Sequence, residues 1–307
     1  MIRVFIDGSA GTTGLRIRER LAQRKDLSLL TLPESLRKDP EARKEALNTA
    51  EVSFLCLPDA AAVEAVSLVS SPDAILIDTS TAHRTVTGWE YGFPELKGRR
   101  ERIASASRIA NPGCHASGFI ALVAPLIECG LLEKDVHLAC FSLTGYSGGG
   151  KKMIAQYEEA SRDPLLEAPR QYGLSQSHKH LPEMAVQCSL RFPPVFCPVV
   201  APYYAGMEVT VPLTEAETSA SPEELSELYR AYYTDGMVHF VSGDEETGFL
   251  SAGALSGRDD MEIRVCGNQE RKLLIARFDN LGKGASGAAI QNMNLRLGLP
   301  ENTGLVG

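Results

Sequence analysis

Cys114 is the residue of this chain best placed to do chemistry. It follows an Asn-Pro-Gly sequence at residues 111–113, which predicts a sharp turn from a strand into a helix. A thiol at the N-terminus of a helix lies near the positive end of the helix dipole, which lowers the pKa of the thiol. Cys56, Cys140 and Cys266 instead fall in apolar runs that predict core positions in strands. We therefore predict that Cys114 is a catalytic nucleophile.

A nucleophilic thiol needs a base that takes its proton. Six histidines are present, and two of them, His178 and His180, share a dense polar stretch of sequence that ends in Pro-Glu. His115 is next to the cysteine, but neighbouring side chains on a helix point about 100° apart. His137 and His239 are expected inside strands, with structural roles. We predict His180 as the base, ahead of His178.

Three glycines, Gly8, Gly11 and Gly14, follow the first predicted strand and open the first predicted helix. Their spacing is a variant of the dinucleotide fingerprint, in which glycine lets backbone N–H groups approach a pyrophosphate at a helix N-terminus. A tight turn without a ligand is the alternative. The residues expected to bind the cofactor here are Gly8, Ser9, Gly11, Thr12, Thr13 and Gly14.

The residues alone leave the type of nicotinamide cofactor open. Glu34 lies about 20 residues beyond the last glycine, where an acidic side chain takes the ribose 2′-hydroxyl of NAD. Ser35, Arg37 and Lys38 follow at once, and such a group suits the 2′-phosphate of NADP. Both interpretations stand at this point.

The composition limits the partners of the protein. The chain has 307 residues, 44% of them hydrophobic, and a net charge of −8. This charge argues against nucleic acid or an anionic membrane as the main partner, because both need a concentrated positive field. We see no signal-peptide pattern, no apolar stretch long enough to span a membrane and no Cys-x-x-Cys pair. We expect a cytoplasmic protein with reduced thiols and no metal site.

The pattern of elements predicts an α/β fold with two domains. In the first third, apolar strands at residues 2–6, 27–32, 52–57 and 74–78 alternate with helices at 15–21, 40–48 and 60–69. Such alternation is typical of a parallel sheet covered on both faces. From about residue 136 the pattern is mixed. There we expect strands at 137–143, 208–213, 237–241, 261–266 and 272–278, a helix opened by a capping box at 221–224, and a last helix at 285–297.

Together these motifs resemble those of the N-acetyl-γ-glutamyl-phosphate reductases, in the shorter form of that family, over nearly the whole chain. The matching segments are residues 8–14, the Tyr-Gly-Phe-Pro-Glu sequence at 91–95, the turn at 111–114, the glycine- and lysine-containing segment 145–152, the histidine stretch 178–183, and residues 279–294. Any one of them could occur by chance, whereas six in this order are highly specific.

The resemblance implies a Rossmann dinucleotide-binding domain, residues 1–114 and 285–307. An α+β catalytic and dimerisation domain of the glyceraldehyde-phosphate-dehydrogenase type, residues 115–284, would interrupt it. The resemblance also implies NADP(H) as cofactor and the reduction of an acyl phosphate to an aldehyde in arginine biosynthesis. The expected partners are the small-molecule acyl phosphate and inorganic phosphate, and the expected assembly is a homodimer or homotetramer.

The resemblance further implies roles for single residues. Cys114 would form a thioester, and His180 would hold the thiolate and later give a proton to the thiohemiacetal oxygen. Ser35 and Arg37 would bind the NADP phosphate, and Asn280 would hold the nicotinamide carboxamide. The residues expected to bind the substrate are Ser147, Gly148, Lys151, His178 and Glu183.

The chain departs from the longer form of the family at two places. That form carries Tyr-Pro-Thr after the cysteine, where this chain has His115-Ala116-Ser117, and an arginine near the position of Tyr203-Tyr204. If that arginine grips the substrate carboxylate, another cation or the tyrosine hydroxyls must do so here. The alternative functions are the same chemistry on an aminoadipyl or aspartyl phosphate, a cysteine hydrolase that uses Cys114 and His180, and a non-catalytic dinucleotide sensor.

Overall fold

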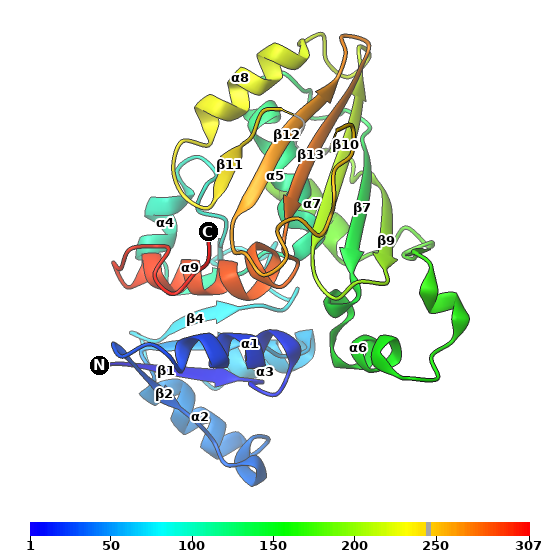
Figure 1. Ribbon diagram of the computed structural model, residues 1–307. Helices are drawn as coiled ribbons and strands as arrows, with labels where there is room; N and C mark the ends of the chain where they lie inside the picture. Colours follow the sequence, from blue (N-terminus) through cyan, green and yellow to red (C-terminus); the bar gives the residue numbers. More distant parts are fainter. Residues whose placement is uncertain (244–246) are drawn as a thin grey trace. The chain divides into compact units, whose positions relative to one another are not determined.

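The computed structural model describes residues 1–243 and 247–307, and the chain divides into two compact units (Figure 1). The first consists of Met1–Pro112 and Ala285–Leu305, and the second of Gly113–Gly284 with Val306–Gly307. Cys114 thus lies at the start of the second unit. Among the described residues, no helix is long and apolar enough to cross a membrane.

The first unit contains a six-stranded parallel sheet in the order β2-β1-β3-β4-β6-β5. Its strands are β1 (Ile2–Asp7), β2 (Leu27–Leu30), β3 (Val52–Leu55), β4 (Ile75–Asp78), β5 (Glu90–Tyr91) and β6 (Arg108–Ala110). Its helices are α1 (Thr12–Leu21), α2 (Pro40–Thr49), α3 (Asp59–Ser67), α4 (Arg99–Ser105) and α9 (Gly287–Arg296). The predicted α/β architecture with a parallel sheet is confirmed.

Helices cover both faces of this sheet, which explains why its central strands are apolar on both sides. Side chains of α1, α4 and α9 pack in one buried cluster, and those of α2 and α3 pack in another. Local signals fix where these helices begin. The Asp39 side chain, for example, accepts a hydrogen bond from the Ala42 N–H at 2.8 Å, and Pro40 occupies the first turn of α2.

The last helix, α9, returns the chain to the first unit. A π-helical turn, Gly282–Ser286, precedes it. Two buried amides of α9 hold the Tyr-Gly-Phe-Pro-Glu sequence at 91–95. Asn292 Nδ2 donates to the Gly92 carbonyl oxygen at 2.9 Å, and Gln291 Nε2 donates to the Glu95 carboxylate at 2.8 Å. A Cβ atom at Gly92 would lie 2.4 Å from Asn292 Nδ2, so only glycine fits there.

The second unit contains a mixed seven-stranded sheet in the order β11-β12-β13-β10-β7-β9-β8. Its strands are β7 (Ala139–Gly145), β8 (Arg170–Gln171), β9 (Val195–Ala201), β10 (Met207–Thr214), β11 (Val238–Phe240), β12 (Met261–Gly267) and β13 (Arg271–Phe278). Its helices are α5 (Cys114–Glu128), α6 (Gly150–Glu158), α7 (His180–Gln187) and α8 (Pro222–Tyr232). The predicted capping box opens α8, with Ser221 and Glu224 bonding each other's backbone.

Helix α5 packs against β10 and β13, and α7 and α8 contact it as well. Every side chain from His115 to Leu126 is buried. Pro125 lies inside this helix and has no N–H to give to the Ala121 carbonyl oxygen. The Tyr233 hydroxyl donates to that oxygen instead, at 2.8 Å, so α5 continues through its proline.

Some predictions were wrong in detail. Strand β9 was not predicted, because Pro198 interrupts its apolar run and proline is rare inside sheets. His137 lies before β7 rather than in a strand, and its ring stacks on Phe192 with centroids 4.6 Å apart. Cys56 lies just after the end of β3, and burial raises the pKa of its thiol to about 12.

Candidate active site

Cys114 is the first residue of α5, and the turn before it is held on both sides. Glu183 of α7, which is buried, accepts a hydrogen bond from the Gly113 N–H at 2.8 Å. In the first unit, the Asn111 side chain donates to the Ala285 carbonyl oxygen at 3.0 Å and accepts from Asn292 at 3.1 Å. The carboxylate and the two amides therefore fix the backbone that leads into the cysteine.

Beside the cysteine, three histidines gather in the second unit. The His115 ring lies with its centroid 5.7 Å from that of His178 and 5.5 Å from that of His180. The rings of His178 and His180 are 4.7 Å apart. Tyr172 and Phe196 complete this ring cluster. The structure thus brings the two predicted histidines together with one that the sequence placed elsewhere.

His115 is held at both nitrogens. Its Nδ1 lies 2.7 Å from Ser142 Oγ of β7, and its Nε2 lies 2.6 Å from the Tyr172 hydroxyl oxygen. Burial, with a smaller contribution from His178, lowers the pKa of His115 to about 3. The imidazole is therefore neutral at any working pH.

The two histidines of the polar stretch differ in setting. The His180 N–H donates to His178 Nδ1 at 3.2 Å, and His180 itself is buried at the start of α7. Burial, together with the charge of Lys179, lowers the pKa of His178. Because a backbone N–H is always a donor, Nδ1 of His178 carries no proton, and the neutral ring has its hydrogen on Nε2.

The predicted substrate segment lies after β7. A short 3₁₀ turn, Tyr146–Gly149, leads into α6, where Lys151 is exposed. Ser147 is buried, and its hydroxyl oxygen accepts from Asn280 Nδ2 at 2.9 Å. Asn280 Oδ1 in turn accepts from the Gly206 N–H at 2.9 Å. Asn280 therefore ties this turn to the segment before β10, and a Cβ atom at Gly148 would lie 3.5 Å from its Nδ2.

The tyrosines at the position of the longer form's arginine lie next to this turn. The N–H groups of Tyr146 and Ser147 donate to the carbonyl oxygens of Tyr203 and Tyr204 at 2.9 and 3.0 Å. Tyr204 is exposed. The Tyr203 hydroxyl oxygen is buried and has no hydrogen-bond partner among the described residues. A buried hydroxyl in that state is a candidate for contact with a ligand.

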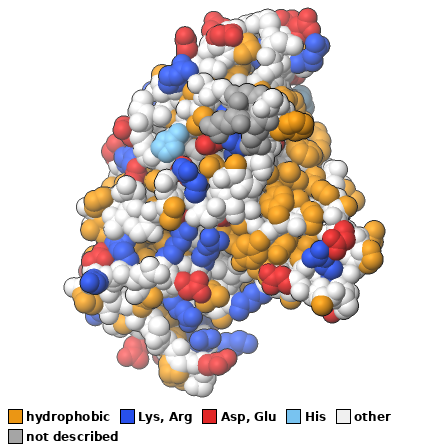
Figure 2. All heavy atoms as spheres, in the orientation of Figure 1, with side chains coloured by type: hydrophobic (Ala, Val, Ile, Leu, Met, Phe, Trp, Pro, Cys, Tyr) orange, Lys and Arg blue, Asp and Glu red, His pale blue; other side chains and the backbone are white. Residues whose placement is uncertain are grey.

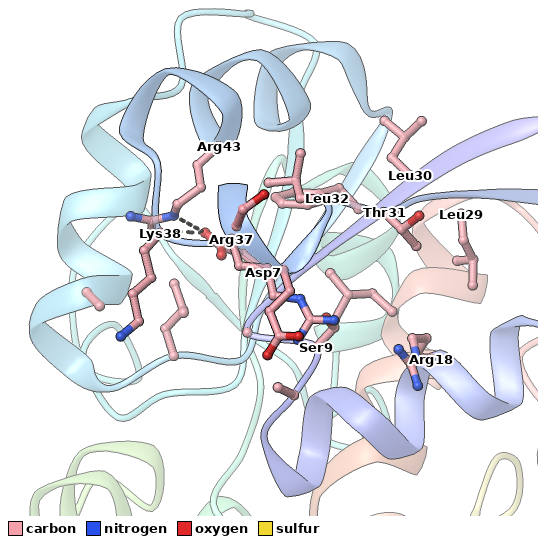
Figure 3. A pocket seen from close by; sticks show the side chains of 18 of the residues that line it. Asp7, Ser9, Arg18, Leu29, Leu30, Thr31, Leu32, Arg37, Lys38 and Arg43 are labelled. Atoms are coloured by element: carbon pink, nitrogen blue, oxygen red, sulfur yellow. Dashed lines mark hydrogen bonds and ion pairs between the residues drawn. The ribbon is translucent and has the colours of Figure 1, made fainter.

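The first unit carries a pocket of about 660 Å³ at the carboxyl end of β1 (Figure 3). It is lined by parts of the glycine loop, the end of β2 and the residues that follow. The predicted cofactor residues among its lining are Gly8, Ser9, Ser35 and Arg37. Gly11, Thr12, Thr13 and Gly14 lie in the adjoining loop and first turn of α1.

The glycine loop is shaped for close approach. Gly8 has φ of +86°, and a Cβ atom there would lie 2.2 Å from the Cys56 carbonyl oxygen. A Cβ atom at Gly14 would lie 2.5 Å from the Gly8 carbonyl oxygen. Thr12 Oγ1, in the first turn of α1, is buried without a hydrogen-bond partner among the described residues. These features fit a group that binds at the helix N-terminus.

The cations around this pocket fall into two kinds. Arg43 is buried and pairs with Asp7 at 3.0 Å, as the dashed lines of Figure 3 mark. Arg18, Arg37 and Lys38 line the pocket without an ion pair to any described residue. Glu34 is the one acid of the lining that is similarly unpaired within the described residues. The pocket therefore has an excess of uncompensated positive charge.

Comparison with known proteins finds a family model and close relatives. A family model described as the semialdehyde dehydrogenase dimerisation domain matches residues 114–280. The N-acetyl-gamma-glutamyl-phosphate reductase 2 of Nostoc sp. is 44% identical over 318 residues, covering 99% of each chain. The N-acetyl-gamma-glutamyl-phosphate reductase of Brucella ovis is 45% identical over 306 residues, covering 96% of this chain and 99% of the relative.

This chain belongs to the N-acetyl-γ-glutamyl-phosphate reductase family. The family resemblance seen in the sequence is confirmed. The assignment to an oxidoreductase that acts on an acyl phosphate with a nicotinamide cofactor is confirmed as well. Solved structures agree on the fold. Aspartate semialdehyde dehydrogenase II of Vibrio cholerae, in complex with ASA, has a TM-score of 0.72 at 16% identity over 97% of this chain and 98% of its own. The aspartate semialdehyde dehydrogenase of Candida albicans with NADP has a TM-score of 0.67 at 14% identity, over 99% of this chain and 100% of its own.

The sequence missed two members of the site. No sequence pattern indicated Tyr172 as a site residue. It lies in a polar stretch far from the cysteine in sequence, and it contacts His115 only in the folded chain. His115 was not chosen as the base because its side chain points away from that of Cys114 on the helix. That direction points it at Ser142 in the sheet, where it bonds Tyr172 as well. Glu183, expected at the substrate, contacts the backbone of the cysteine turn.

Proposed function

We propose that this chain reduces N-acetyl-γ-glutamyl phosphate to N-acetylglutamate 5-semialdehyde with NADPH and releases phosphate, a step of arginine biosynthesis. The observation that carries the proposal is Cys114 at the N-terminus of α5, in a chain that matches curated reductases of this name over nearly its full length.

In the first step the Cys114 thiolate attacks the γ-acyl carbon. A sulfur–carbon bond forms, the carbon–oxygen bond to phosphate breaks, and the phosphate leaves with that electron pair. The first-turn N–H groups of α5 have no acceptor within the helix. The Gly113 N–H is already taken by Glu183, and we assign oxyanion stabilisation to the other backbone N–H groups around Cys114.

We assign the base to His180 by elimination within the ring cluster. His115 has both nitrogens bonded and a pKa lowered to about 3. His178 already uses Nδ1 to accept from a backbone N–H, so it presents a donor and not an acceptor to the site. His180 takes the thiol proton and returns it to the oxygen of the thiohemiacetal. NADPH, when bound, supplies the hydride that reduces the thioester.

The substrate groups follow from the same geometry. Ser147 accepts from Asn280, so the hydroxyl hydrogen of Ser147 is available to a phosphate oxygen, with Gly148 and Lys151 in the same segment. His178 presents its Nε2–H. We assign the substrate carboxylate to Tyr203, whose buried hydroxyl has no partner within residues 1–243 and 247–307. Glu183 keeps the cysteine turn in place, and contact of Glu183 with the substrate remains our prediction.

We assign the pocket of the first unit to the adenosine end of NADP. Arg18, Arg37 and Lys38 line it without ion pairs to described residues, and Ser35 adds a hydroxyl. Such a group binds a 2′-phosphate with charge-assisted hydrogen bonds. Gly11, Thr12, Thr13 and Gly14 would face the pyrophosphate. We keep Asn280 as the partner of the nicotinamide carboxamide, because one N–H of its amide is not used by Ser147.

We further propose that a second copy of the chain covers the outer face of the seven-stranded sheet. Helix α5 packs on one face, and Phe141, Val195 and Leu273 are exposed at 44%, 61% and 41% on strands β7, β9 and β13. Figure 2 shows hydrophobic side chains gathered over β7, β9 and β10. The matching family model is described as a dimerisation domain and spans these strands. We expect a homodimer by this face, and a homotetramer would need a second surface.

We place the protein in the cytoplasm. No disulfide joins the seven cysteines, all of which lie in the described residues. A reducing compartment keeps thiols, including a catalytic one, in this state.

The reverse reaction tests the proposal. Purified protein receives N-acetylglutamate semialdehyde, phosphate and NADP, and NADPH formation is followed by absorbance, with Cys114→Ser beside it. We expect phosphate-dependent NADPH formation that the variant lacks. Turnover with NAD alone would overturn the cofactor assignment. Turnover only of the aspartate or aminoadipate semialdehyde would overturn the substrate assignment, and no turnover with any of the three would overturn the proposed reaction.

A further inference from the structure

Arg170 is a partly buried arginine of the second unit that makes no ion pair with any described residue. Its Nη2 donates to the Tyr157 hydroxyl oxygen at 3.1 Å, and its guanidinium carbon lies 5.5 Å from the centre of the Tyr157 ring. Its Nε is buried without a hydrogen-bond partner among the described residues. A guanidinium has five N–H donors in a planar fork that matches a carboxylate. Within the described part of the chain, most of these donors are unused.

The other arginines of the second unit are in a different state. Those that pair with a carboxylate are Arg162, Arg258, Arg264, Arg271 and Arg277. Arg191 and Arg230 are exposed, and each lies over a phenylalanine ring. Taking a charge out of water without a counter-ion costs free energy, and an anionic ligand offsets that cost. Arg170 is therefore the arginine of this unit that best fits such a ligand.

The strand register places Arg170 in a row of side chains that leads to the predicted substrate segment. Arg170 of β8 lies opposite Val200 of β9, and Val200 lies beside Thr144 of β7. Residues paired across neighbouring strands have their side chains on the same face of a sheet. Thr144 comes near the end of β7, directly before the 3₁₀ turn that contains Ser147. Arg170 therefore shares a sheet face with the start of that turn.

The adjacent row of the same face carries the ring cluster. Ser142 lies beside Pro198 in this row, and the Tyr172 N–H donates to the Pro198 carbonyl oxygen at 3.0 Å. The side chains of Ser142 and Tyr172 both bond the ring of His115. Tyr172 is two residues from Arg170, and alternate residues of a strand point to the same face. Arg170 thus lies one row away from the ring cluster.

Tyrosine rings connect Arg170 to the substrate turn. Tyr146 of this turn stacks on Tyr157, with ring centroids 4.6 Å apart and planes 6° from parallel. Tyr157 is the residue that the Arg170 guanidinium contacts. The Tyr146 N–H donates to the carbonyl oxygen of Tyr203, the residue whose hydroxyl we assign to the substrate carboxylate, at 2.9 Å. Arg170 and Tyr203 therefore lie on either side of the same stacked pair.

We propose that Arg170 binds the α-carboxylate of the substrate and so determines specificity for a carboxylate-bearing aldehyde. The inference rests on the proposed function, because it assumes an N-acetylglutamyl substrate. The guanidinium supplies the charge and a fork of N–H donors, and the Tyr203 hydroxyl supplies a further hydrogen bond. In this substrate three carbons separate the carboxylate from the reacting carbon. A cation beside the ring cluster, and not against the reacting sulfur, fits that separation.

The test compares two aldehydes that differ only in this carboxylate. In the reverse reaction with phosphate and NADP, N-acetylglutamate semialdehyde carries the carboxylate and 4-acetamidobutanal lacks it. Arg170→Gln should raise KM for the first aldehyde about 30-fold and leave kcat/KM for the second within about twofold of wild type. Arg170→Lys keeps the charge without the fork and should fall in between. KM for NADP should not change, because Arg170 does not line the pocket of the first unit.

Arg162→Gln is the matched control. Arg162 lies in the same segment and also bonds Tyr157, through the Tyr157 carbonyl oxygen at 2.8 Å, but its charge is paired with Glu167. We expect this variant to keep wild-type kcat/KM with both aldehydes. Circular dichroism checks that each variant folds. If Arg170→Gln does not fold, the comparison is made with Arg170→Lys.

The outcomes separate this inference from the proposed function. A loss of the same size with both aldehydes in Arg170→Gln would mean a structural role and would overturn the inference. An unchanged KM for N-acetylglutamate semialdehyde, or an equal rise in Arg162→Gln, would overturn it as well. In each of these cases the wild type is active, so the proposed function stands. A wild type that turns over neither aldehyde would overturn the proposed function and the inference with it.

Discussion

In the first unit, Arg37 and Lys38 line the pocket as exposed cations without ion pairs to described residues. In the second unit, the polar groups around Cys114 are buried and bonded to one another. Arg37 and Lys38 illustrate the first case, and His115 the second. The contrast follows from the two tasks. A dinucleotide phosphate is itself charged, so the cations that bind it can remain solvated and unpaired until it arrives. A reacting thiolate needs donors that are already oriented, because reorientation during the reaction raises the barrier.

The backbone differs between the two sites in the same way. In the first unit, Gly8 and Gly14 are required because a side chain would strike backbone atoms, and we propose that the backbone of this loop binds the cofactor. In the second unit, Glu183 and Ser142 hold the backbone and ring of residues next to the cysteine. Substitutions around the pocket of the first unit should therefore affect cofactor binding, and substitutions next to Cys114 should affect reactivity.

The largest expected effect is at the nucleophile. Cys114→Ser should lower kcat by more than about 1000-fold, because the hydroxyl is not ionised at neutral pH. NADPH affinity should be unchanged, since Cys114 does not line the pocket and is not among the residues assigned to the cofactor. Turnover assays and calorimetric titration with NADPH measure the two quantities. A parallel loss of NADPH binding would break the division of tasks between the units.

Substitution at Gly8 should show how much the loop geometry contributes. Gly8→Ala places a Cβ atom 2.2 Å from the Cys56 carbonyl oxygen, whereas Gly88→Ala meets nothing within 4 Å at a similar φ of +89°. Gly88→Ala should cost about 1 kcal/mol of unfolding free energy, and Gly8→Ala about 3 kcal/mol with weaker NADPH binding. Urea unfolding of both variants measures the difference. Equal losses would mean that the crowding at Gly8 does not matter.

The exposed cations should act on the cofactor alone. Arg37→Ala should raise KM for NADPH by about tenfold or more and leave KM for NADH unchanged, because only NADPH carries the 2′-phosphate. Lys25→Ala is the control, an exposed cation of the same unit that does not line the pocket. Steady-state kinetics with both cofactors provide the readout. An equal change in both KM values would argue against the phosphate contact.

A further effect concerns the buried histidine and pH. The pKa of His115 is lowered from 6.5 to about 3, so between these values the unfolded chain binds a proton that the folded chain does not. Stability must then fall as pH drops below about 6.5. Between pH 7 and pH 5 the wild type should lose about 2 kcal/mol more than His115→Gln. Urea unfolding at both pH values tests this, and equal losses would show that His115 is not held neutral.

The elements of the first unit could be predicted because local sequence patterns mark them. Apolar strands alternating with helices have a period that is visible in the sequence, and the glycine loop has a fixed spacing because backbone must approach backbone at Gly8 and Gly14. Cys114 was recognisable for the same reason, since its turn and helix are local. The polar sequence before α7 also marked the region of the two histidines.

The remaining parts depend on contacts between distant segments, which no local pattern records. Tyr172 meets His115 across 57 positions, and Glu183 meets Gly113 across 70. Strand β9 was hidden by Pro198, which the sheet accommodates between β7 and β8. His115 was judged by its direction relative to the cysteine alone, while its place is set by Ser142 on a neighbouring strand.

The most direct test of the account is to trap the acyl-enzyme. The protein is mixed with N-acetyl-γ-glutamyl phosphate in the absence of NADPH, quenched in acid, and digested for peptide mass spectrometry. We predict one N-acetylglutamyl group per chain, on Cys114, released by hydroxylamine as expected for a thioester. Phosphate release without an adduct, or an adduct on another cysteine, would contradict the role of Cys114 as the nucleophile.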